Sequence, residues 1–94
     1  MNTRETRRWF EAVASLQTCA LCNAWGVQVA HRDYGKGMGI KTDPWETAPL
    51  CPGCHRELTD GTQYTRAEKR ALMDRAIVNT HSKLIRGGVL ELAA

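Results

Sequence analysis

The sequence predicts a small α+β domain that a bound metal ion stabilises. Two segments have the apolar periodicity of helices, and two short runs between them resemble strands. The chain has 94 residues, and a domain of this size buries only about 60–65% of its unfolded surface, so its core alone leaves it marginally stable. The four cysteines occur as two Cys-x2-Cys pairs, which suit a stabilising metal site. We therefore expect residues 1–94 to form one metal-stabilised domain.

Two helices are expected to flank the centre of the sequence. The first is predicted over residues 2–17, where apolar residues recur at helical spacing and Asn2 and Glu5 are placed as a capping box. The second is long, starts at the capping box Thr65–Glu68 and ends at the Gly-Gly pair 87–88. We expect its apolar residues to form one buried stripe, which comprises Ala71, Leu72, Ile77, Val78, Leu84 and Ile85.

The centre of the sequence predicts two short strands. They span residues 27–31 and 46–50, and the segment 32–44 between them contains three alternating glycines that predict a loop. After the second strand, the Pro-Gly pair 52–53 predicts a tight turn. A short helix is then expected over residues 55–60.

The two cysteine pairs, Cys19/Cys22 and Cys51/Cys54, are the strongest chemical signal. No apolar stretch approaches the about 18 residues of a membrane span, and the N-terminus is polar, so we expect a cytoplasmic chain without membrane association, where disulfides are rare. A thioredoxin-like redox pair is disfavoured because the sequence lacks its βαβ pattern. Four thiolates can enclose one tetrahedral Zn²⁺, which typically contributes roughly 10–16 kcal/mol of apparent binding energy. A structural zinc site is preferred to four unrelated buried thiols.

Positive charge permits a nucleic-acid partner without requiring one. The formal net charge is +3 and the sequence pI is about 8.8. In the glycine-rich loop, Arg32, Lys36 and Lys41 are candidate phosphate contacts, although a solvated loop is an equal alternative. We interpret a further basic run on the long helix as a solvated face; it comprises Arg66, Lys69, Arg70 and Arg75.

Two histidines remain once the cysteines fill a zinc site. His31 ends the first predicted strand and His55 directly follows the last cysteine, so a zinc ion that joins these segments should bring both imidazoles together. Two imidazoles near a basic, glycine-rich loop suggest metal-assisted phosphodiester chemistry. His81 has no evident partner and is interpreted as structural. Trp25 and Trp45 are expected to pack in a core around the zinc.

The segments CALC, VQVAHRDYGKGMGIK and APLCPGCHREL resemble small phage and prophage-encoded nucleases of the HNH superfamily, also called the ββα-metal or treble-clef superfamily. The resemblance extends from the first helix to the end of the last one. It implies a treble-clef zinc domain, DNA as the substrate, and a bacterial host cytoplasm. It also implies that His31 is the general base and that His55 ligates a catalytic divalent ion such as Mg²⁺.

The chain departs from the HNH pattern at three positions. Ala30 replaces an acidic ligand, Glu46 replaces an asparagine, and Thr59 replaces a histidine or aspartate. Four carboxylates could complete a metal shell, namely Asp33, Asp43, Glu46 and Asp60. Two hypotheses follow. The first is a metal-dependent DNA endonuclease, and the alternative is a non-catalytic, zinc-stabilised module that binds nucleic acid or acts as an adaptor.

Overall fold

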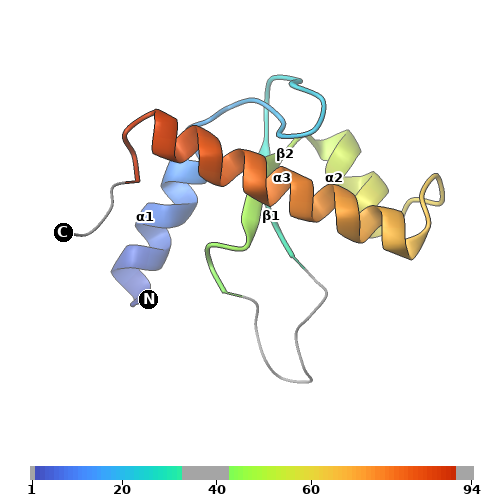
Figure 1. The fold of residues 1–94 in the computed structure, drawn as a ribbon, viewed down its shortest axis with the longest axis horizontal. Coiled ribbons are helices and arrows are strands. Elements are labelled where there is room, and N and C mark those ends of the chain that lie inside the picture. Colours follow the sequence, from blue (N-terminus) through green and yellow to red (C-terminus); the bar gives the residue numbers. More distant parts are fainter. Residues whose placement is uncertain (1, 33–42, 91–94) are drawn as a thin grey trace.

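The computed structural model describes residues 2–32 and 43–90. This part of the chain forms three helices and a two-stranded sheet, which confirms the predicted α+β class (Figure 1). In chain order, the elements are α1 (Thr3–Ala14), β1 (Gln28–His31), β2 (Thr47–Leu50), α2 (Pro52–Thr59) and α3 (Arg66–Arg86). Most of the predicted glycine-rich loop, including Asp33, Lys36 and Lys41, lies outside the described residues.

The sheet is an antiparallel pair whose two faces contact different helices. In its register Ala30 lies opposite Ala48, and His31 lies opposite Thr47. Because side chains alternate along a strand, the two alanines share one face and His31 and Thr47 the other. On the second face, Nε1 of Trp9 in α1 donates a hydrogen bond to Oγ1 of Thr47, 3.0 Å away. Helix α3 packs on the first face. Because α1 and α3 both contact β2, all four of its residues are buried.

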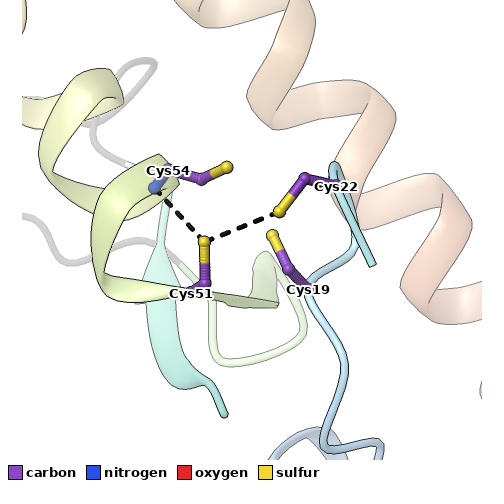
Figure 2. Close-up of side chains that lie close together, drawn as sticks. All are labelled: Cys19, Cys22, Cys51 and Cys54. Atoms are coloured by element: carbon purple, nitrogen blue, oxygen red, sulfur yellow. Dashed lines mark hydrogen bonds between the residues drawn. The ribbon is translucent and has the colours of Figure 1, made fainter. Parts of the chain in front are cut away.

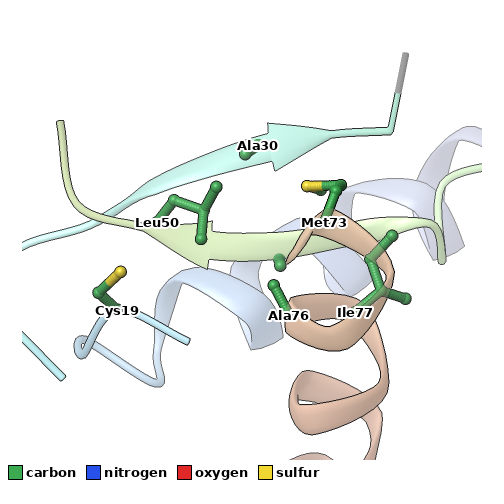
Figure 3. Packing of buried hydrophobic residues seen from close by; sticks show 7 residues of the cluster. Cys19, Ala30, Leu50, Met73, Ala76 and Ile77 are labelled. Atoms are coloured by element: carbon green, nitrogen blue, oxygen red, sulfur yellow. The ribbon is translucent and has the colours of Figure 1, made fainter. Parts of the chain in front are cut away.

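The main core lies between the sheet and α3. Figure 3 shows Ala30 and Leu50 of the strands beside Met73, Ala76 and Ile77 of the helix, and these residues belong to one buried cluster. Cys19 joins the same cluster and thereby connects the first cysteine pair to the core.

The predicted apolar stripe of α3 is partly wrong. Ile77 and Leu84 are buried, but Ala71, Val78 and Ile85 are exposed. The prediction grouped apolar residues without keeping them on one helical face, whereas a helix of 3.6 residues per turn buries positions three and four apart. The buried positions are Met73, Ala76, Ile77, Thr80 and Leu84.

Both predicted capping boxes are confirmed, whereas the start of α2 differs from the prediction. Asn2 with Glu5 caps α1, and Thr65 with Glu68 caps α3. Helix α2 begins at Pro52, three residues before the predicted start. Proline suits the first helical turn because its φ angle is already helical and its missing N–H would have no intrahelical partner there. The Pro-Gly pair is therefore the first turn of a helix.

Candidate metal centre and adjoining cleft

The first cysteine pair lies on a tight turn that its own backbone closes. A bridge between Thr18 and Trp25 brings the ends of this segment together, and the Cys19 amide donates to the Ala24 carbonyl at 2.8 Å. Asn23 has a φ of 64°, in the left-handed region that asparagine tolerates better than most residues. The turn therefore presents both thiols of the pair toward the start of α2 (Figure 2).

The second cysteine pair belongs to the N-terminus of α2. Cys51 is the N-cap residue, and its Sγ accepts a hydrogen bond of 3.4 Å from the Cys54 backbone amide. The sulfur thus satisfies one of the helix's unpaired N–H groups while remaining directed at the first pair. Because His55 follows Cys54 in this same turn, the cysteine pair also determines where the histidine lies.

The four sulfurs form one cluster that can hold a metal ion such as zinc. The ligand atoms of Cys19, Cys22, Cys51 and Cys54 all lie within 4.8 Å of one another. Figure 2 shows the four thiol groups gathered between the two segments. The sulfurs of Cys22 and Cys51 are 3.7 Å apart, close to the about 3.8 Å expected between thiolates that surround Zn²⁺ tetrahedrally at about 2.3 Å. All four thiols are free. The predicted convergence of the two pairs is confirmed.

The electrostatics of the cluster favour a cation at its centre. Burial would raise the pKa of the Cys19 thiol, but hydrogen bonds from the backbone amides of Cys51 and Cys22 lower it to about 6. For Cys54, burial and then the neighbouring thiols raise the pKa. Several thiolates cannot share so small a space without repulsion, and a divalent cation between them removes that repulsion.

A cleft of about 440 Å³ lies beside the metal centre, between β1, α2 and the first turns of α3. Both His31 and His55 line it, so the structure brings together the two histidines that the sequence singled out. The other lining residues are Ala30, Leu50, Leu58, Thr59, Arg66, Lys69, Arg70 and Met73. Within the described part of the chain, this lining contains three basic side chains and no carboxylate.

A hydrogen bond to the neighbouring strand orients His55. Its Nδ1 lies 2.8 Å from Oε1 of Gln28, and because an amide oxygen can only accept, Nδ1 carries the proton. The lone pair of a neutral imidazole is then on Nε2, where it can bind a metal or accept a proton. His31 is exposed, and its ring packs edge-on against Phe10 with centroids 5.4 Å apart.

The three candidate carboxylate ligands that the structure describes, Asp43, Glu46 and Asp60, do not gather around His55. Glu46 accepts hydrogen bonds from Arg32 and from the Asp43 backbone, and Asp60 is the exposed C-cap residue of α2. None of these three carboxylates lines the cleft. Within residues 2–32 and 43–90, the four cysteines are the one group of three or more metal-ligating side chains close enough to share an ion. The described residues therefore do not assemble a second metal site.

The departures from the HNH pattern have local structural counterparts. Ala30 is only 1% exposed and packs in the main core, and it borders the cleft with a methyl group that cannot bind a metal. Thr59 lies one helical turn after His55, lines the same cleft, and donates its hydroxyl to the His55 carbonyl at 2.8 Å. Position 59 thus lies where a further ligand could join His55.

The contacts of Arg32 and the position of the basic run on α3 were not evident from the sequence. Arg32 forms ion pairs with Glu46 at 2.8 Å and with Asp74 at 3.4 Å. By contrast, part of the basic run on α3, interpreted above as a solvated face, lines the cleft; these residues are Arg66, Lys69 and Arg70. Their spacing of three and four residues, repeated at Met73, is the signal that could have assigned them to one helical face.

The expectation that Trp25 and Trp45 pack in a core around the zinc is wrong. Trp25 is 77% exposed and Trp45 is 40% exposed, so neither is buried in a core around the cysteines. His81, which had no evident partner in the sequence, donates from Nε2 to the Trp45 carbonyl at 2.7 Å and packs edge-on against Trp9. His81 therefore helps to join α3 to α1 and to the segment before β2.

Comparisons with protein-family models, curated proteins and solved structures find no match to this chain. Among the helices of the described residues, none combines the length and apolar character needed to cross a membrane.

Proposed function

We propose that this chain is a zinc-stabilised, metal-dependent DNA endonuclease of HNH type. The observation that carries the proposal is the shared cleft of His31 and His55, which come from different elements and lie among basic side chains beside the cysteine cluster. The resemblance of the sequence to HNH nucleases supports the same function. A phage or prophage origin is part of this proposal and rests on the resemblance alone.

In the proposed reaction, neutral His31 accepts a proton from the water that attacks the phosphorus atom. Its exposed position at the end of β1 gives it access to solvent and substrate. His55 lines the same cleft from α2, and Nε2 is its metal-binding atom in this proposal because Nδ1 is engaged by Gln28. The catalytic divalent ion of this class would be held through His55, while the described carboxylates do not complete its ligand set.

The zinc ion has a structural role in this proposal. It would join the turn that carries Cys19 and Cys22 to the first turn of α2, and His55 is the residue after Cys54. Closing the cluster therefore positions His55 relative to β1, which carries both Gln28 and His31. Zinc removal should disturb the cleft even though zinc does not line it.

Nicking of supercoiled plasmid DNA tests this function. The zinc-loaded chain should nick DNA when Mg²⁺ or Mn²⁺ is added and should not do so without an added divalent ion. His31→Ala should abolish nicking while zinc content and the circular dichroism spectrum stay unchanged. The control is His81→Ala, which removes a histidine outside the cleft and should leave nicking intact. Nicking by His31→Ala at the parent rate would refute the assignment of the base.

A non-catalytic module that binds nucleic acid is the second candidate. It is favoured by the lining of the cleft, which is basic and to which residues 2–32 and 43–90 contribute no carboxylate. Such a module should bind DNA in the cleft but produce no nicks with Mg²⁺, Mn²⁺ or Ni²⁺. The plasmid assay combined with a binding measurement therefore separates the two functions.

A further inference from the structure

We infer that Arg66 and Arg70 of α3 form a binding site for the backbone phosphates of DNA on the wall of the cleft. Both side chains line the cleft that also contains His31 and His55. They lie four residues apart, so they are neighbours on one side of the helix. This inference rests on the proposed function, because it uses the same cleft and the same ligand, DNA. Binding of the phosphates does not require that the DNA is cleaved.

Two of the three basic residues of this wall, Lys69 and Arg70, also interact with other groups of the protein. The ammonium of Lys69 donates a hydrogen bond to the Gly61 carbonyl at 2.5 Å. Lys69 therefore ties the first turns of α3 to the end of the α2 segment and contributes charge to the cleft from a fixed position. For Arg66, the structure gives no hydrogen bond or ion pair of the guanidinium with any described residue.

The electrostatics of the cleft select an anionic ligand. Among the described residues, three basic side chains and two imidazoles line it, and no carboxylate does. Arg66 also lies in the first turn of α3, where the helix dipole adds positive potential. A guanidinium binds phosphate oxygens through two parallel N–H groups, which makes arginine better suited than lysine to hold a phosphodiester in one orientation.

The same helix supplies a matched control in Arg75. It lies nine residues after Arg66, and at about 100° per residue it lies on the opposite side of the helix. Arg75 is exposed and is not among the residues that line the cleft. Replacing it removes one positive charge from α3 without altering the cleft, so it separates a phosphate site from a general effect of net charge.

Fluorescence anisotropy with a labelled DNA duplex tests the inference in zinc-loaded protein without any other divalent ion. We expect Arg66→Ala and Arg70→Ala each to weaken binding several-fold and to lower the slope of log affinity against log salt concentration by about one. Arg75→Ala should leave that slope unchanged, and Arg66→Lys should recover part of the affinity. Zinc content and circular dichroism establish that each variant is folded.

Three results would overturn the inference. They are an equal loss of affinity in Arg75→Ala, an unchanged salt slope in both cleft variants, and no binding of duplex DNA by the parent at low salt. If the endonuclease proposal alone is wrong, the parent should still bind DNA through Arg66 and Arg70 but should not nick it. Nicking by the parent with arginine-independent binding would refute the inference alone.

Discussion

The side-chain amide of Gln28 joins strand β1 to helix α2 through a hydrogen bond of 2.8 Å to Nδ1 of His55. The two residues are 27 positions apart in the sequence. The bond sets the ring tautomer and the direction of Nε2, as a carbonyl partner commonly does for metal-binding histidines. Gln28 is therefore a positioning residue for the proposed role of His55.

Gln28→Leu should lower the nicking rate about 10–100-fold, because partners of this kind typically affect activity or metal affinity by that factor. Gln28→Glu retains an acceptor oxygen and should recover part of the rate. The ¹⁵N chemical shifts of the His55 ring provide a readout independent of activity, since the Leu variant should lose the single tautomer. Shifts identical to those of the parent would show that Gln28 does not orient the ring.

The chain should contain one zinc ion, and Cys51→Ser should abolish both zinc binding and stable folding. Serine retains an oxygen that can cap α2, as the Cys51 sulfur does for the Cys54 amide, so the loss would report the metal and not the helix cap. Elemental analysis and thermal circular dichroism measure the two effects. A zinc-free parent, or an unchanged melting temperature in Cys51→Ser, would contradict this prediction.

Acid should release the metal and destabilise the chain. The pKa of Cys19 is lowered in the folded state to about 6, below the ordinary value of 9.0 for a thiol. A group with a depressed folded-state pKa stabilises the fold above its unfolded pKa, and this contribution is lost as the pH falls through the folded value. Because a bound zinc ion keeps its thiolates deprotonated, we expect zinc release, measured with a chromophoric indicator, to occur below the value of about 6 and together with loss of helical circular dichroism. Full zinc retention with unchanged circular dichroism in strong acid would contradict the prediction.

Thr59→Asp should strengthen binding of Mn²⁺ in the cleft. The substitution places a carboxylate one helical turn after His55 on the surface that lines the cleft. Isothermal titration with Mn²⁺ should show tighter binding than in the parent, and His55→Ala in the Thr59→Asp background should remove the gain. Asp60 is already acidic but lies outside the lining, so Asp60→Asn is a matched control. Equal Mn²⁺ affinity in the parent and Thr59→Asp would argue against a metal site at His55.

Local features were predictable because neighbouring residues carry the relevant information. The capping boxes at Asn2 and Thr65 follow from hydrogen bonds between residues three apart, and both occur in the structure. The strand predictions 27–31 and 46–50 are each one residue longer than β1 and β2. The pairing of the two Cys-x2-Cys motifs was also predictable, since one tetrahedral ion needs four ligands.

Features that depend on which helical face meets the core were predicted less well. Val78 and Ile85 are apolar but exposed, while Thr80 is buried and donates its hydroxyl to the Ala76 carbonyl at 2.7 Å. Trp25 is largely exposed despite its size. Apolar residues tend to be buried, but packing of the helix against the sheet determines which positions are buried.

The sequence by itself determined the α+β class, the helix starts at Thr3 and Arg66, and the four-cysteine cluster, because each depends on local hydrogen bonding or on ligand number. Only the tertiary structure placed Gln28 against His55 and moved Arg66 and Arg70 from an apparent solvated face to the wall of the histidine cleft. These relationships join residues from β1, α2 and α3. They depend on how the three elements pack, and that packing is a property of the whole fold that no single segment encodes.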